Sequence, residues 1–199
     1  HMGVELGFKV PLPVQGLSVE GALSWGEYIY TSTPRMTQTV DNSAEVVHDN
    51  AQVPYWASHP IYKKYTDDFG VVTYETDVDG NYIVEKNQKH YVPSTPQLAA
   101  DLGLNYRTNS YWFFEIDAQY FAKSYLDMNP LYRTDMITAG PDKIVTPVEV
   151  DELTAQEKFA PVFLLNASIG KSWYIDRKYN FGFSLNLQNH ITLHRIHYL

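Results

Sequence analysis

Residues 97–121 read QLAADLGLNYRTNSYWFFEIDAQYF, and they carry the clearest structural signal in the chain. On both sides of the polar triplet Thr108-Asn109-Ser110, apolar residues occupy every second position, although Phe113 interrupts the polar phase. Successive side chains of a β-strand point to opposite faces, so this alternation predicts two strands, at 97–107 and 111–121. The triplet predicts a tight turn between them.

The same alternation recurs in four other stretches of the chain, near 4–10, 17–28, 162–175 and 179–189. The six runs predict an all-β fold of antiparallel strands, each with one apolar and one polar face. Phe114, Ile116, Leu102, Leu104, Phe183 and Leu185 are expected on one side of a single sheet. The runs are close to the roughly 9–11 residues that a tilted strand needs to cross a bilayer.

Short and long connections alternate along the chain. Pro11 to Gly16 and Asp176-Arg177-Lys178 are short, whereas residues 29–96 and 122–160 are long. Ordinary domains rarely contain loops longer than about 15 residues, but transmembrane β-barrels combine short periplasmic turns with long extracellular loops. We therefore interpret residues 1–199 as one partial β-barrel domain whose up-and-down strands carry two extracellular loops.

The long segments contain weaker structural signals. Residues 71–76 and 82–85 flank Asp79-Gly80, a dipeptide typical of β-hairpin turns. In the second segment, we expect at most one helical turn, at residues 154–158. Ile191 and its neighbours extend the last strand or form a tail.

Aromatic residues gather at the two ends of the expected strands. One group flanks the short turns: Tyr106, Tyr111, Trp112, Trp173, Tyr174 and Tyr179. A second group lies at the opposite strand ends: Trp25, Tyr28, Tyr30 and Tyr120. Two such bands are typical of proteins whose strands end at the two interfaces of a membrane.

Composition excludes several classes of protein. The 199 residues carry a net charge of −8 and include no dense basic run, which argues against nucleic-acid binding. The absence of cysteine excludes disulfides and thiolate metal sites. No apolar run approaches the roughly 20 residues of a transmembrane helix, so a membrane protein of this sequence must use strands.

Two patterns invite a metal site, and in both we favour a simpler interpretation. Residues 77–81 resemble the start of a calcium loop, but Tyr82 stands where such a loop needs glycine and Gln88 where it needs an acid. His190, His194 and His197 would align on a helix, yet they follow directly on a strand. We expect no metal site and no cofactor.

No catalytic constellation stands out, and we expect the chain not to be an enzyme. The sequence lacks the common nucleophile, zinc-protease, phosphate-loop and dinucleotide motifs. Glu115 and Asp117 share one strand face and would suit a carboxylate pair in a carbohydrate-active enzyme. In a barrel, that phase is polar simply because it faces the lumen.

The candidate binding residues fall into two sets. Lumen-facing positions are Glu20, Asp101, Asn105, Arg107, Glu115, Asp117, Asn166 and Asn186. Candidate ligand contacts in the long loops are Tyr55, Trp56, Tyr62, Tyr65, Tyr132 and Arg133. Loop aromatics at a barrel mouth can stack on a flat ligand such as a sugar, or can pack the loop on itself.

Several stretches resemble the late strands of TonB-dependent outer-membrane receptors, above all the starch-utilisation-type importers of Bacteroidetes. They are VPSTPQLAADLGLNYR at 92–107, YWF at 111–113, YFAKSYLDMNP at 120–130, Arg133-Thr134 and LNASIGKSW at 165–173. The resemblance implies an outer-membrane barrel of about 22 strands around an N-terminal plug. It also implies energy supplied by TonB through the plug, and a surface lipoprotein lid that hands over oligosaccharides or peptides.

The chain departs from that family pattern, because it contains no plug, no energy-coupling segment and only some of the strands. After Gln188-Asn189 it runs through His190 to Leu199, where the family continues with further strands. We therefore expect a six-stranded section of such a transporter, with outer-membrane lipid and the remaining barrel and plug as its partners. The alternative is a soluble or small closed β-barrel that binds a ligand, in which the 71–85 hairpin completes eight strands around an apolar interior.

Overall fold

A computed structural model of the chain describes residues 1–93, 95–133, 146–176 and 178–192. The chain divides into two compact units. Unit 1 comprises residues 1–27, 94–125 and 158–199, and unit 2 comprises residues 28–93 and 126–157. Unit 2 is thus formed by the two long segments between the strands of unit 1.

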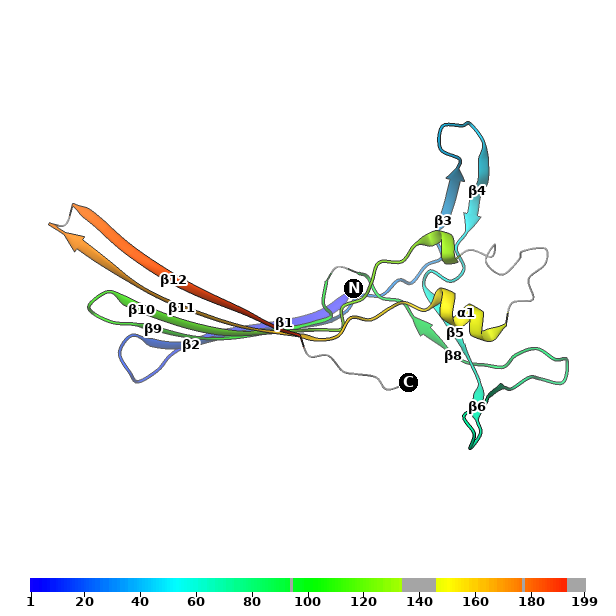
Figure 1. Cartoon of the computed structure of the whole chain (residues 1–199), viewed down its shortest axis with the longest axis horizontal. Helices are drawn as coiled ribbons and strands as arrows, with labels where there is room; N and C mark the ends of the chain where they lie inside the picture. The colour runs from blue at the N-terminus through cyan, green and yellow to red at the C-terminus, as the bar shows by residue number, and fades with distance from the viewer. Residues whose placement is uncertain (94, 134–145, 177, 193–199) are drawn as a thin grey trace. The chain divides into compact units, whose positions relative to one another are not determined.

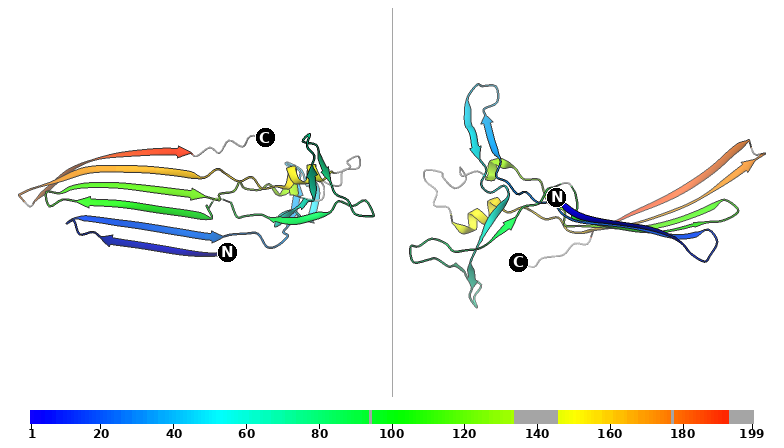
Figure 2. Two further views of the ribbon diagram at one scale, coloured as in Figure 1. Left: turned by 90° about the horizontal axis from the view of Figure 1, so that it is seen from below. Right: turned by 180° about the vertical axis from the view of Figure 1, so that it is seen from behind.

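Unit 1 is a single antiparallel sheet of six strands in the order β1-β2-β9-β10-β11-β12. Figure 2 shows these strands side by side, from blue β1 to red β12. The strands are β1 (Met2–Pro11), β2 (Leu17–Glu27), β9 (Leu98–Arg107), β10 (Trp112–Ala122), β11 (Val162–Ile175) and β12 (Tyr179–Thr192). The predicted all-β, antiparallel, up-and-down arrangement of these strands is confirmed.

Strand register sorts the side chains of the sheet into an apolar and a polar face. Leu104 lies opposite Val19 on β2 and opposite Ile116 on β10. Phe114 pairs with Ile169, which pairs with Leu185. The predicted placement of the large apolar residues on one side of the sheet is therefore confirmed, because aligned residues of neighbouring strands point to the same face.

The exposure of the two faces is the reverse of that in a soluble sheet. On the central strands, Leu102 is 56% exposed and Ile116 is 51% exposed. The acids of the same strands point to the other face and are less exposed. Asp101, Glu115 and Asp117 are all half-buried. Apolar side chains of a soluble protein are normally buried against another layer, whereas the large apolar residues of this face are exposed.

The short connections all lie at the same end of the sheet, as Figure 1 shows. Thr108 closes the β9–β10 turn, because its Oγ1 accepts a hydrogen bond from Trp112 N at 3.0 Å. Tyr111 completes this turn with a φ of 64°. In the β1–β2 turn, Gly16 has a φ of 81°, and its carbonyl accepts a hydrogen bond from Arg107 N at 2.8 Å.

The described strands do not form a closed barrel. β1 and β12 are the two edges of the sheet, and each pairs with one neighbour among the described strands. The eight-stranded alternative requires residues 71–85 in the same sheet, but those residues lie in unit 2 and pair there. The small closed barrel is therefore not the arrangement found in the described residues.

The described residues of unit 2 form three two-stranded antiparallel sheets and two short helices. The strand pairs are β3 (Arg35–Thr39) with β4 (Val46–Gln52), β5 (Ser58–Tyr62) with β8 (Val84–Lys89), and β6 (Lys64–Thr66) with β7 (Val72–Tyr74). The helices are the 3₁₀-helix η1 (Pro130–Arg133) and the α-helix α1 (Pro147–Thr154). No helix among the described residues is long and apolar enough to span a membrane.

The long segments are more ordered than the sequence indicated, and two local predictions about them need correction. The helix occupies Pro147–Thr154 rather than residues 154–158. The turn at Asp79-Gly80 forms, and near it the two predicted hairpin arms are joined by the bridge Thr76–Tyr82 and by a hydrogen bond from Ile83 N to Glu75 O at 3.0 Å. Farther from the turn, β7 pairs with β6 instead. The reason is that Val72, Thr73 and Tyr74 form their strand pairing with Lys64–Thr66.

Candidate functional site

The polar face of the sheet brings together all eight residues predicted to face a lumen. One row across the strands contains Glu20, Gly103, Asp117 and Asn166. The next row contains Asn105, Glu115, Ser168 and Asn186. Asp101 and Arg107 lie on the same face of β9, two positions beyond these rows. The result is a continuous polar surface contributed by five strands.

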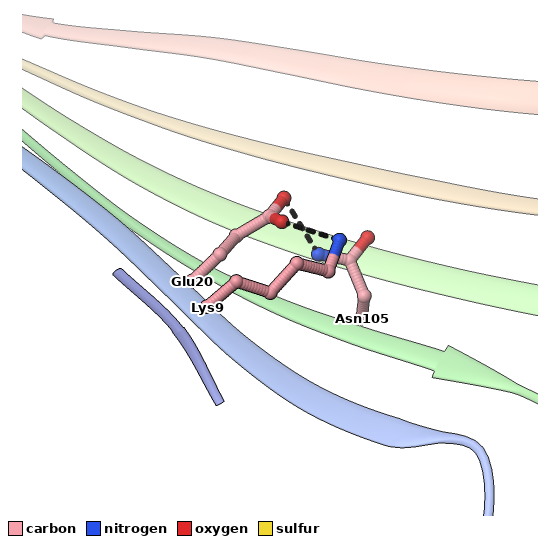
Figure 3. A network of polar contacts seen from close by, with 3 residues as sticks. All are labelled: Lys9, Glu20 and Asn105. Carbon is pink, nitrogen blue, oxygen red and sulfur yellow. Dashed lines mark hydrogen bonds and ion pairs between the residues drawn. The ribbon is translucent and has the colours of Figure 1, made fainter. Parts of the chain in front are cut away.

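Glu20 is the centre of a network that links three strands (Figure 3). Lys9 Nζ on β1 donates to Glu20 Oε2 at 2.8 Å. Asn105 Nδ2 on β9 donates to Glu20 Oε1, also at 2.8 Å. Gly103 makes room for this arrangement, since a Cβ at that position would lie 3.2 Å from Glu20 Cγ. Both carboxylate oxygens of Glu20 are therefore engaged by neighbouring strands.

Glu115 and Asp117 each accept a hydrogen bond from β11. Asn166 Nδ2 donates to Asp117 Oδ2 at 2.8 Å, and Ser168 Oγ donates to Glu115 Oε2 at 3.3 Å. Each carboxylate thus has its own polar partner on the adjacent strand. This pattern fixes a row of acids and amides along the face, which suits a hydrated wall for a polar solute.

The polar face also contains two hollows. A larger one of about 580 Å³ is lined by polar and small residues such as Ser24, Ala99 and Asp101, together with the apolar Leu6, Leu23 and Phe121. A smaller one of about 290 Å³ is lined by Lys9, Gly16, Ser18, Asn105 and Arg107. Arg107 is exposed at this hollow, close to the short turns. The hollows make the face uneven but do not enclose a site.

In unit 2, the predicted ligand-contact aromatics lie in two groups and one isolated position. Trp56 packs on Tyr30 with ring centroids 5.2 Å apart. Tyr62 makes an edge contact with Tyr82 at 6.1 Å, and Tyr82 makes another with Tyr74 at 6.2 Å. Tyr65 is exposed on β6. Sequence reasoning missed Tyr74 and Tyr82 as partners, although both lie in the predicted hairpin segment.

Burial changes the acid–base behaviour of these aromatic residues. Burial raises the pKa of Tyr62, and the nearby Tyr55 adds to that rise. Burial also raises the pKa of Tyr30, with a smaller contribution from Asp127. In both residues, burial therefore disfavours the ionised phenolate.

Arg133 is almost fully buried, with 6% of its surface exposed. Its Nη1 donates to Asn129 O at 3.3 Å, and its Nη2 donates to Ala155 O at 3.1 Å. Burial lowers the pKa of the guanidinium. These contacts tie η1 to the chain that follows α1. The side chain of Tyr132, the other candidate in η1, lies outside the described residues.

A buried pair of histidines, which sequence reasoning did not anticipate, lies at the centre of unit 2. His59 Nδ1 and His90 Nε2 are 2.8 Å apart, and the rings stack with centroids 5.0 Å apart. His90 Nδ1 lies 2.9 Å from Trp56 O. Burial is the largest of the causes that lower the pKa of His90 to about 4. The residues are 31 positions apart, so no spacing in the sequence pointed to this contact.

Two turns in unit 2 share one design. Asp67 Oδ1 accepts hydrogen bonds from Phe69 N and Val71 N, each at 2.9 Å. Asp77 Oδ1 accepts from Asp79 N at 2.9 Å and from Asn81 N at 2.8 Å. Gly70 and Gly80 both have a φ of 83° and complete the two turns.

The bonds to Asp77 favour the interpretation of residues 77–81 as a hairpin turn rather than as a calcium loop. The backbone bond from Asn81 is the largest of the contacts that lower the pKa of Asp77. Its carboxylate therefore stabilises the turn itself. Among the described residues, no group of three or more potential ligands could hold a metal ion. His194 and His197 lie outside the described residues, as does the side chain of His190.

Comparisons of the chain with family models, with curated proteins and with solved structures found no match.

Proposed function

We propose that the chain is a section of a TonB-dependent outer-membrane β-barrel that takes part in the import of a bulky nutrient. The observation that carries this proposal is the reversed exposure of the sheet. Large apolar residues of the central strands face outward uncovered, whereas acids and amides of the same strands are linked in hydrogen-bonded rows. Lipid on one side and a hydrated lumen on the other satisfy both faces.

Strand length and the position of the aromatic residues support the same proposal. The six strands contain 10 to 14 residues, enough for tilted strands to cross a hydrocarbon layer. Trp112 and Trp173 lie at the short-turn end of the apolar face, and Trp25 and Tyr120 lie toward the other end. Aromatic rings of this kind prefer the two interfaces of a bilayer.

Unit 2 supplies the candidate contacts for the nutrient. Its tyrosine cluster of Tyr62, Tyr74 and Tyr82 offers flat apolar surfaces, which suit stacking on an oligosaccharide or on aromatic side chains of a peptide. In this proposal, unit 2 is extracellular and meets a surface lipoprotein lid. The remaining barrel, the plug and TonB come from outside the sequence described above. The proposal involves no catalysis and no cofactor.

Single-cysteine spin labelling tests the membrane part of the proposal, and the cysteine-free chain is well suited to it. Labels are placed on β9 at Leu102→Cys and Leu104→Cys, and as matched controls at Asp101→Cys and Asn105→Cys. The full chain is then incorporated into phosphatidylcholine vesicles. We expect high oxygen accessibility at Leu102 and Leu104, because oxygen concentrates in the hydrocarbon layer. Asp101 and Asn105 should instead be accessible to a water-soluble nickel reagent.

An absence of this two-residue alternation would contradict the transmembrane orientation. If all four labels respond to the nickel reagent alike, the sheet lies in water and the membrane proposal is wrong. Binding of candidate oligosaccharides and peptides to the same vesicles, with Tyr82→Ala as the variant, tests nutrient recognition separately.

A further inference from the structure

Six aromatic rings form a connected belt on the apolar face near the short turns. Their centroids follow one another at 5.9 to 6.2 Å in the order Tyr106, Phe114, Trp112, Phe183, Trp173, Phe181. We call these six residues the aromatic belt. It spans four strands, from β9 to β12, and its rings come from residues that strand register places on one face.

A single cation lies within this belt. Lys171 on β11 is paired with Trp112 on one side and with Phe183 on the other. Its Nζ lies 4.8 Å from the centroid of the Trp112 ring and 5.4 Å from that of Trp173. In the described strands, Lys171 is the only basic residue in the apolar rows.

Lys171 has a cation–π environment, and it forms no ion pair with the described residues. The described ion pairs involve other lysines, namely Lys9 with Glu20 and Lys63 with Glu75. The two ring faces attract the positive charge of the ammonium group. They are weaker hydrogen-bond acceptors for its three N–H groups than the oxygen atoms of an anion are. The site is therefore complementary to an anion that approaches the belt from outside the sheet.

We propose that Lys171, flanked by Trp112 and Trp173, binds the phosphate of a phospholipid headgroup at the short-turn end of the sheet. This inference rests on the proposed membrane orientation. At that end, the aromatic belt lies at the level where acyl chains give way to headgroups. A lysine there extends its apolar stem along the hydrocarbon and directs its ammonium group toward the phosphate layer.

The belt also explains why a headgroup, and not a dissolved anion, fits this position. The rings of Trp173, Phe181 and Phe183 provide an apolar surface beside the cation, and the exposed Leu185 and Leu187 continue it along β12. A phospholipid occupies both parts at once, since its phosphate meets Lys171 and its acyl chain covers the neighbouring apolar residues. Leu185 and Leu187 lie on the side of Phe183 away from the short turn, which is the side that an acyl chain would cover if its phosphate were bound at Lys171.

Native mass spectrometry of the full chain, released from a neutral maltoside detergent, tests the site. Phosphatidylglycerol is the probe, and a galactosyl diacylglycerol with the same acyl chains is the phosphate-free comparison. The variants are Lys171→Gln and, as the matched control, Lys178→Gln in the adjacent exposed turn. We expect wild type and Lys178→Gln to retain one phosphatidylglycerol, and retention to fall about fivefold in Lys171→Gln. The galactolipid should be retained weakly and equally by all three.

The other outcomes separate this inference from the proposed function. If Lys171→Gln retains phosphatidylglycerol as wild type does, or if both lipids are retained equally, the phosphate site is wrong while the membrane orientation stands. If no form of the chain retains either lipid, both proposals are contradicted. If a dimer without lipid is seen and Lys171→Gln abolishes it, the cation belongs to a contact between copies of the chain, and the lipid assignment is wrong.

Discussion

At the scale of single residues, the histidine pair of unit 2 has a defined protonation state. Trp56 O can only accept a hydrogen bond, so His90 Nδ1 must carry the proton of that contact. In neutral His90, Nε2 is then an acceptor, and His59 Nδ1 donates to it. Protonation of His90 would place two N–H groups against each other, so the buried pair favours the neutral ring.

This arrangement predicts that unit 2 loses stability in acid. The pKa of His90 is about 4 in the folded chain and near 6.5 when exposed. Because the folded value is the lower one, the stability is fully present above pH 6.5 and decreases as the pH falls toward 4. The loss should reach about 2 kcal/mol at pH 5 and about 3 kcal/mol below pH 4. Hydrogen exchange at the His90 amide, corrected for its intrinsic pH dependence, measures this loss.

His90→Gln is the control for this prediction, because glutamine can donate to Trp56 O but does not titrate between pH 4 and 7. We expect this variant to be less stable than wild type at pH 7.5 and nearly independent of pH down to 5. An equal loss of protection in wild type and His90→Gln would assign the acid sensitivity to other groups.

Phe113 shows how one residue that breaks a pattern can still fit the fold. It lies on the mainly polar face, directly opposite Gly170. A Cβ on Gly170 would lie 2.4 Å from the Phe113 ring, so the ring covers the glycine backbone. Phe8 covers Gly21 in the same way on the apolar face. The sequence shows the interruption, but only strand register shows the glycine that explains it.

At the scale of elements, the long strands were predictable and the short ones were not. Ten or more residues of alternation specify a strand and its two faces, as in β9 and β10. β6 has three residues and β8 reads VEKNQK, and neither contains a periodic pattern. These strands form because the chain brings them together, so their pairing is determined by tertiary structure rather than by local sequence.

The helix α1 was misplaced although its start had a sequence signal. Thr146 and Glu149 form a capping box, in which Thr146 N donates to Glu149 Oε2 at 2.9 Å and Glu149 N donates to Thr146 Oγ1 at 3.4 Å. Proline follows the cap at the first helical position, where it is favoured. The weak apolar periodicity of the eight residues concealed this boundary.

The turn between β1 and β2 leads to a prediction about Gly16. Its φ is positive, and a Cβ at this position would lie 1.8 Å from Arg107 O. Gly16→Ala should therefore lower the local free energy of opening by about 3 kcal/mol, through backbone strain and displacement of β9. Hydrogen exchange at the Arg107 amide, which donates to Gly16 O, measures the effect.

Gly70→Ala separates the two causes. Gly70 has a nearly identical φ of 83°, but no atom lies within 4 Å of the position of its Cβ. We expect a loss of only about 1 kcal/mol there, measured at the Val71 amide. Similar losses at both positions would mean that the contact with Arg107 contributes nothing beyond backbone strain.

At the scale of the whole molecule, the polar face was predictable because one period governs it. The shared face of all eight residues that were predicted to face a lumen follows from the two-residue repeat of a strand. The interior of unit 2 was not predictable, because contacts such as His59–His90 join distant segments without any repeat. A single sequence indicates which face of a strand a residue occupies, but not which loops pack together.

The open sheet predicts how the isolated chain behaves in solution. β1 and β12 expose unpaired backbone groups in the described strands, and the apolar face includes Phe114, Ile116 and Leu185 in exposed positions. We expect the chain to need detergent or to associate through these surfaces. Size-exclusion chromatography with light scattering, without detergent, measures this. A sharp monomer peak at 22.9 kDa would instead support the soluble alternative.

The paired ends of unit 2 bear on the order in which the chain folds. Val92 N donates to Tyr28 O at 2.8 Å, and Leu126 N donates to Glu157 O at 2.9 Å, so each long segment is closed at its own base. The entropy lost in joining two strands grows with the length of chain between them. If these bases close early in folding, the effective chain length between β2 and β9 falls from about seventy residues to a few. The pairing of the two strands then resembles a local contact, which forms faster than a long-range one. The same closure restricts the register of that pairing, in which a slip of one residue would exchange the apolar and polar faces of the strand.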